Sequence, residues 1–372
     1  MAFKKMGEIL CEGGSSEAAL FYINEALRKF QALAGQGNQS AARMVSNSLI
    51  QQGDCLRHLG RLEESVNAYQ KSISLSEELN DIRTVAVGKA QIGTVWMYQG
   101  KWDKSLEAHI EAMKLFSKLE EPSSVATAWH QIGMVHEETE NWVDAEESYR
   151  QSLSLEVQQH DKAGEASTLN QLGNLYDKMN RLEEALLFTR QAAEKYKEIN
   201  DLIKVGICRS NLALTLIQLQ RFIEARHEIL QAIKYLKPFG KSAESWKAYD
   251  ILCDLERAVG NEDDALKARA QAFQLYLSFR REGGENHMNE GRTCANILHL
   301  MKSMQLEEIS ELLGKEITEI NAGDSFGLFL SKLPLILAGE RDQSIWNDPN
   351  LHYMDAVELF LLIEKLDAGA KQ

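Results

Sequence analysis

The sequence predicts an all-α protein built from tandem antiparallel helix pairs. One small residue recurs at a constant step of 40 positions, at Gly53, Gly93, Gly133, Gly173, Ala213 and Cys253. A second column of small residues lies 12 positions later and keeps the same step: Ser65, Ser105, Ala145, Ala185, Ala225 and Ala265. The 372 residues include only 4 prolines, and the scarcity of this strong helix breaker favours helices throughout. A constant period of this kind is typical of repeat arrays, in which each unit contacts mainly its neighbours.

Residues 1–40 are expected to form a degenerate leading repeat. Ala19, Ile23 and Ala26 follow the pattern of a second helix, but they stand 46 positions ahead of the matching residues of the first regular repeat. The six additional residues fit a loop over 35–40. Lys4 and Lys5 are not followed by a continuous apolar stretch, so no secretory signal is expected.

One regular repeat, residues 161–200, shows how each unit is expected to fold. Asp161 is placed to cap a first helix whose apolar residues follow 3- and 4-residue spacing. Asn180 and Arg181 form a short turn, and the second helix carries its inner apolar face on Leu182, Ala185, Leu186, Ala192, Ala193 and Tyr196. Gly173 and Ala185 are expected where the two helices cross most closely.

The segments QLGNLYDKMNRLEEALLFTRQA and QIGTVWMYQGKWDKSLEAHIEAM resemble the tetratricopeptide repeat. The step exceeds the usual length of about 34 residues and is similar to the long repeats of kinesin light chains and LGN-type scaffolds. The resemblance covers six repeats over residues 41–280. It implies a right-handed superhelical solenoid whose first helices line a concave groove. The sixth repeat departs from the pattern, with Glu256 and Arg269 at apolar positions, and is therefore expected to be more exposed.

Residues 281–372 keep no 40-residue step and are expected to form a helical capping module. Helical patterns occur near 289–303, 305–321, 325–338 and 353–367. The stretch FRREGGENHMNEGR at the start of this region resembles repeat-bearing regions of large bacterial signalling proteins. That resemblance implies an alternative in which the array is the sensor of a longer protein and controls an attached effector.

The net charge and the absence of catalytic motifs disfavour several classes of function. The net charge of −14 disfavours binding to nucleic acid or to anionic membranes. The chain has no GxxxxGK[ST] motif, and His136–Glu137–Glu138 lacks the second histidine of a zinc protease motif. Glu282, Glu285 and His287 are interpreted as a solvated turn, and no metal or cofactor is expected. The five cysteines form no CxxC pair and indicate reduced thiols in a cytoplasmic protein.

The groove implied by the resemblance defines the candidate binding residues. Positions three before, one after and four after each 40-residue anchor are expected to point into it. Asn170 and Asn174 share one helix face, and their amides suit the backbone of an extended peptide. Val87, Met97 and Tyr98 could receive apolar anchors or pack in the core. The predicted function is a non-catalytic scaffold that binds a peptide or helix of a partner protein through Met97, Tyr98, His130, Met134, Asn170, Asn174, Asp177 and Ser210.

Overall fold

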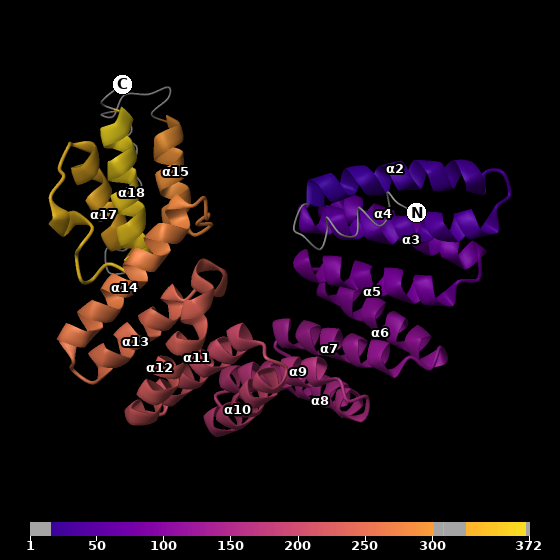
Figure 1. The fold of residues 1–372 in the computed structure, drawn as a ribbon, viewed down its shortest axis with the longest axis horizontal. Helices are drawn as coiled ribbons and strands as arrows, with labels where there is room; N and C mark the ends of the chain where they lie inside the picture. The colour runs from indigo at the N-terminus through magenta and orange to yellow at the C-terminus, as the bar shows by residue number, and fades with distance from the viewer. Residues whose placement is uncertain (1–15, 301–307, 309–324, 370–372) are drawn as a thin grey trace. The chain divides into compact units, whose positions relative to one another are not determined.

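The computed structural model describes residues 16–300, 308 and 325–369, which belong to two compact units, residues 1–199 and 200–372 (Figure 1). Every regular element of these described residues is a helix. The predicted all-α class is therefore confirmed for the part of the chain that the structure describes.

The first unit is a series of helices in which each contacts the next along the chain (Figure 1). Four antiparallel pairs follow the leading helix, as the 40-residue step predicts. Ala19, Ile23 and Ala26 of the leading helix are buried. The helices are α2 (Ser16–Ala34), α3 (Gln39–His58), α4 (Leu62–Glu78), α5 (Ile82–Tyr98), α6 (Trp102–Lys118), α7 (Pro122–Glu138), α8 (Trp142–Gln158), α9 (Lys162–Lys178) and α10 (Leu182–Glu198).

Short polar residues start the first helices of the repeats. The Asp81 carboxylate accepts a hydrogen bond from the Thr84 amide at 3.1 Å, and Asp161 accepts from the Gly164 amide at 3.0 Å. Both contacts satisfy amides that have no partner inside the helix. α7 instead begins at Pro122, whose missing N–H costs nothing at the first helical position.

A residue with positive φ ends almost every helix of the repeats, at intervals of 20 positions. In the first unit, the backbone N–H of the next residue donates a hydrogen bond to the carbonyl five residues before it. Asp81 N, for example, donates to Ser76 O at 2.8 Å. The positions in the two units together are Gly60, Asn80, Gly100, Glu120, Glu140, His160, Asn180, Asn200, Gln220, Gly240 and Gly260. The half-repeat is thus a structural unit of 20 residues.

The anchor glycines allow the two helices of a pair to approach closely. Ser65 Oγ donates to the Gly53 carbonyl at 2.8 Å, which confirms that the column of small residues lies at the crossing. A second contact was not predicted: a Cβ added at Gly133 would lie 2.7 Å from the Tyr149 ring, 16 positions further on. Gly173 faces Thr189 in the same way. The residue 16 positions after each anchor therefore fills the space that the glycine leaves.

The second unit contains two more helix pairs and the C-terminal module. Helices expected near 289–303, 325–338 and 353–367 are present, and the one expected over 305–321 lies outside the described residues. α18 contacts α14, α15 and α17. The elements are α11 (Leu202–Gln218), α12 (Phe222–Leu236), η1 (Lys237–Ala243), α13 (Trp246–Ala258), α14 (Glu262–Arg281), α15 (Asn289–Leu300), α17 (Ser325–Leu337), η2 (Gln343–Ile345) and α18 (Tyr353–Gly369).

The expectation that Glu256 and Arg269 make the sixth repeat more exposed is wrong. Their exposed fractions are 3% and 7%. Glu256 forms an ion pair with Arg226, and its carboxylate accepts a hydrogen bond from Asn261 Nδ2 at 3.0 Å. Arg269 donates to the backbone carbonyls of residues 348 and 351 at 2.9 and 3.0 Å. The two polar side chains are buried because distant segments supply their hydrogen-bond partners.

Candidate functional site

Seven of the eight predicted binding residues lie on three successive first helices of the first unit. α5 contacts α7, and α7 contacts α9. We call the surface of these helices that carries the predicted residues the first-helix face. Its members are Met97, Tyr98, His130, Met134, Asn170, Asn174 and Asp177.

Exposure differs among these residues. Tyr98, at the end of α5, has 59% of its surface exposed, whereas the other six are half-buried. Met134 packs against a core cluster that includes Tyr149 and Tyr176. The eighth residue, Ser210, belongs to α11 in the second unit, is buried, and its hydroxyl has no hydrogen-bond partner.

His130 links the first-helix face to the interior. Its Nδ1 lies 2.9 Å from Thr168 Oγ1, and its ring packs edge-on against Tyr149 with centroids 5.5 Å apart. Thr168 Oγ1 in turn lies 3.0 Å from a carboxylate oxygen of Glu156. Burial lowers the pKa of His130 to about 4 and raises the pKa of Glu156. His130 is therefore neutral near pH 7 and positions α7 against α9.

The Glu137 carboxylate is used in contacts inside the first unit. The Tyr149 hydroxyl donates to its carboxylate at 2.6 Å, and Lys178 forms an ion pair with it at 2.8 Å. Because both interactions occupy a side chain with 7% of its surface exposed, this carboxylate is neutralised within the unit.

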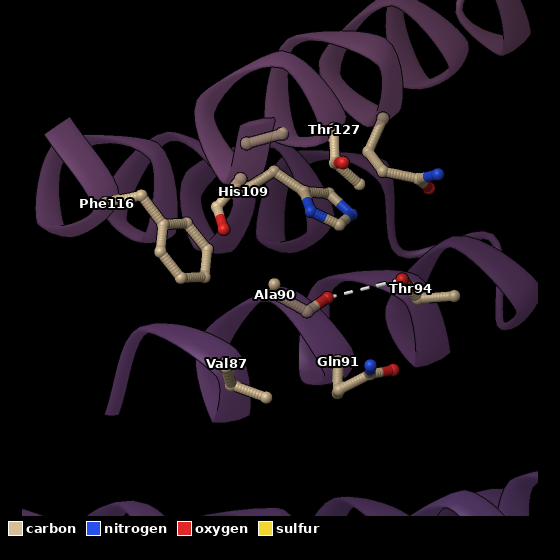
Figure 2. A pocket seen from close by; sticks show the side chains of 10 residues that line it. Val87, Ala90, Gln91, Thr94, His109, Phe116 and Thr127 are labelled. Carbon is tan, nitrogen blue, oxygen red and sulfur yellow. Dashed lines mark hydrogen bonds between the residues drawn. The ribbon is translucent and has the colours of Figure 1, made fainter. Parts of the chain in front are cut away.

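A pocket of about 280 Å³ lies between α5, α6 and α7. Val87, which is predicted to receive an apolar anchor or to pack in the core, is among the residues around it. Figure 2 shows His109 and Phe116 on the opposite side of the pocket from Val87, Ala90 and Gln91. The lining residues are Val87, Ala90, Gln91, Thr94, His109, Phe116, Ser124, Thr127, Ala128 and Gln131.

The pocket is uncharged and contains polar atoms without partners. His109 has no exposed surface, and neither of its ring nitrogens has a hydrogen-bond partner. The buried Oε1 atom of Gln131 also has none. Burial lowers the pKa of His109 to about 4, so its ring is neutral near pH 7. A neutral imidazole has one N–H donor and one acceptor, and hence this wall offers one donor and two acceptors.

Sequence reasoning did not find His109 or Gln131, although one signal was available. His109 stands 16 positions after Gly93, where the neighbouring repeats have Tyr69 and Tyr149. Those tyrosines donate to acidic residues one or four positions after their anchors, at 2.7 and 2.6 Å. The second repeat has Thr94 and Met97 at the corresponding positions. His109 is therefore a polar ring for which the second repeat supplies no acidic acceptor.

The described residues contain no group of three or more His, Cys, Asp or Glu side chains arranged to hold a metal ion. None of the helices within the described ranges is both long and apolar enough to cross a membrane. The four cysteines that the structure describes are buried and form no disulfide bond: Cys55, Cys208, Cys253 and Cys294.

Models of the tetratricopeptide repeat match residues 46–79, 81–155 and 124–198. Among solved structures, a STAND protein with a tetratricopeptide repeat sensor from Pyrococcus horikoshii has 15% identity and a TM-score of 0.61, covering 76% of this chain and 43% of that one. A Rap protein complexed with Competence and Sporulation Factor has 13% identity and a TM-score of 0.53, with 75% of each chain covered. At these identities the similarity concerns the fold alone. No curated protein sequence matches the chain.

Proposed function

Because this chain is a tetratricopeptide repeat protein, we propose that it is a non-catalytic interaction module that binds a segment of a partner protein along the first-helix face. The observation that carries this proposal is the pocket of about 280 Å³, whose wall holds three buried polar atoms without partners. Its residues Ala90 and Thr94 occupy in α5 the repeat positions that His130 and Met134 occupy in α7. Buried polar groups cost free energy unless they are hydrogen-bonded. A partner side chain would satisfy them once the His109 and Gln131 side chains turn toward the pocket, because these atoms are buried in the structure.

The chemistry of the pocket selects a neutral side chain with a polar end. His109 and Gln131 together accept and donate hydrogen bonds, as a hydroxyl or carboxamide group requires. Val87, Phe116 and Ala128 provide apolar walls for the rest of the side chain. A charged side chain would lose its hydration in this pocket without gaining an opposite charge, and we therefore expect it to be rejected.

The two asparagines of α9 would hold the backbone of the same segment. Asn170 and Asn174 lie one turn apart, and a primary amide can pair with both a peptide N–H and a peptide carbonyl. Asn174 Nδ2 donates to Gln171 Oε1 at 3.1 Å, so a bound backbone would compete with that hydrogen bond. The net charge of −14 further favours partner segments that are neutral or basic.

A displayed library of random peptides tests the proposal. We expect the selected peptides to share a neutral polar or tyrosine side chain, and Ala90→Trp, which fills the pocket, to weaken their binding at least tenfold. Val143→Trp is the matched control, because Val143 on α8 is 79% exposed. Replacing Asn170 and Asn174 together by alanine removes hydrogen bonds worth about 0.5–1.5 kcal/mol each. Equal affinities for A90W and V143W would refute the assignment of the pocket.

A second candidate function is a regulatory region in which ligand binding controls an attached effector. It is favoured by the docking of the C-terminal module onto the sixth repeat, where Arg269 donates to the carbonyls of Asp348 and Leu351. Such a contact could transmit a change from the repeats to a neighbouring domain. The size of the native protein on an immunoblot of the source cells would separate the two candidates, because only the second requires a longer chain. Cytoplasmic localisation stays a prediction for either.

A further inference from the structure

A second, larger pocket lies in the C-terminal unit. Its volume is about 590 Å³, within the range of about 300–1,000 Å³ that is common for small-molecule sites. α14 provides one wall, and the segment from η2 to α18 provides the other. The pocket therefore lies where the last repeat meets the C-terminal module.

Arg269 is the unusual residue of this pocket. Only 7% of its surface is exposed, and its Nη2 atom donates to two backbone carbonyls at 2.9 and 3.0 Å. Its Nε atom is buried and has no hydrogen-bond partner. Burial, together with the neighbouring Arg257, lowers the pKa of Arg269.

No described carboxylate forms an ion pair with this guanidinium, although the charge of Asp348 acts on it and offsets part of the fall in its pKa. Asp348, whose backbone carbonyl Arg269 contacts, uses its carboxylate to bind Lys332 at 2.8 Å. Arg281, which also lines the pocket, already has an ion pair with Glu364 at 2.5 Å. One buried positive charge therefore lacks a counter-ion, and an unpaired buried charge is costly. Carbonyl dipoles offset only part of that cost.

Aromatic rings line both walls of the pocket, with Phe273 on α14 and Trp346 and Phe360 on the opposite side. The ring centroids of Phe273 and Phe360 are 6.0 Å apart, and those of Trp346 and Phe360 are 5.6 Å apart, both in edge-to-face geometry. Such rings bind flat apolar groups through large contact areas and favourable edge-to-face packing. The pocket thus combines one uncompensated cation with an aromatic wall.

We propose that this pocket binds a small aromatic carboxylate. The carboxylate would pair with the Arg269 guanidinium through Nη1, because Nη2 already donates to two backbone carbonyls. The aromatic body would pack on Phe273, Trp346 and Phe360. Because the walls come from both the last repeat and the C-terminal module, the bound ligand stabilises their docked arrangement.

The full chain is titrated calorimetrically with 2-naphthoate, with its neutral counterpart 2-naphthamide and with inorganic phosphate. We expect 2-naphthoate to bind at least tenfold more tightly than either of the others. It should also raise the melting temperature of the protein with the logarithm of its concentration once the site is saturated. Equal binding of acid and amide would show that the charge is not used. Equal binding of phosphate would show that the aromatic wall is not used, and absence of naphthoate binding would overturn the proposal.

Two variants locate the site. Ala270 is exposed at the pocket and makes none of the Arg269 contacts, so Ala270→Trp should fill the pocket and abolish naphthoate binding in a folded protein. Ile223→Trp is the matched control, because Ile223 is 89% exposed on α12. Arg269→Gln should remove the preference for acid over amide. Unchanged binding by A270W, or by a folded R269Q variant, would contradict the proposal, whereas failure of the peptide selection would leave it unaffected.

Discussion

Replacing Gly133 by alanine tests the close approach of α7 and α8 with the smallest possible change. The added methyl carbon would lie 2.7 Å from two carbons of the Tyr149 ring, and ordinary contacts begin at 3.4 Å. The ring would therefore have to retreat by about 0.7 Å (3.4 minus 2.7) in a core where overpacking is costly. Tyr149 has no exposed surface, and its hydroxyl donates to Glu137 at 2.6 Å. The ring has little freedom to move.

The magnitude follows from three contributions. Overpacking a core costs about 1–3 kcal/mol. Weakening a hydrogen bond to a charged group costs up to about 1.5–3 kcal/mol. Alanine in place of glycine inside a helix stabilises the folded state by about 1 kcal/mol. We expect Gly133→Ala to lower the free energy of unfolding by about 2 kcal/mol on balance.

Urea unfolding followed by circular dichroism at 222 nm measures this change. The midpoint should fall while the slope stays constant. Gly35→Ala is the matched control and should be nearly neutral, because its Cβ would meet only carbonyl oxygens at 3.5 and 3.7 Å. Adding Tyr149→Ile copies the Ala213 and Ile229 pair of the fifth repeat, so the double variant should cost less than the sum of the single changes. A G133A variant as stable as G35A would refute the packing argument.

Three further changes test other parts of the structure. Glu140 has a φ of 58°, which costs a residue with a side chain about 1–2 kcal/mol, so Glu140→Gly should raise the urea midpoint. Glu138 is exposed and helical, so Glu138→Gly should lower the urea midpoint instead. Midpoint shifts in the same direction for both variants would contradict the claim that the positive φ of Glu140 is strained. His109 and His130 have pKa values lowered to about 4 from 6.5, so the unfolded chain binds protons that the native chain does not. Stability is therefore unaffected by these groups above about pH 6.5 and falls between pH 6.5 and 4, by up to about 1.4 kcal/mol per pH unit for each histidine. Urea unfolding at several pH values should show a shallower decline for His109→Tyr, and an unchanged decline would count against the burial of a neutral ring. Ala145 has no exposed surface, so Ala145→Trp should cost about 1–3 kcal/mol or more, and an unchanged thermal melting curve would show that the column of small residues is misplaced.

Most of the repeat fold could be predicted because small residues at a constant step constrain where helices cross. The turns were harder. Glu120, Glu140 and His160 adopt positive φ, although none is glycine or asparagine, the residues that usually indicate this conformation. Tertiary packing of the flanking helices imposes the turn at these positions, and local propensity alone does not show it. The shared 20-residue spacing was the available signal.

Burial of polar residues could not be predicted from the repeat pattern. Glu256 and Arg269 were expected at an exposed surface because both replace apolar residues. Their partners lie about 30 and 80 positions away along the chain, at Arg226 and at the carbonyls of Asp348 and Leu351. A one-dimensional pattern does not report such distant pairing.

The predicted binding residues and the pocket come from different observations. The position of a residue within its repeat placed seven residues on the three first helices. It did not reveal the pocket, because His109 and Phe116 come from the second helix α6. Their contribution depends on how closely α5, α6 and α7 pack, which the sequence columns describe only in part.

Site-specific photo-cross-linking inside the source cells tests the central claim most directly. A photoreactive amino acid replaces Thr94, which lines the pocket, or Val143, which is 79% exposed on the outer helix α8. We predict that the probe at position 94 captures one discrete protein, identified by mass spectrometry through a peptide with a neutral polar side chain at the linked site. Capture of that protein from position 143 but not from position 94 would contradict binding on the first-helix face.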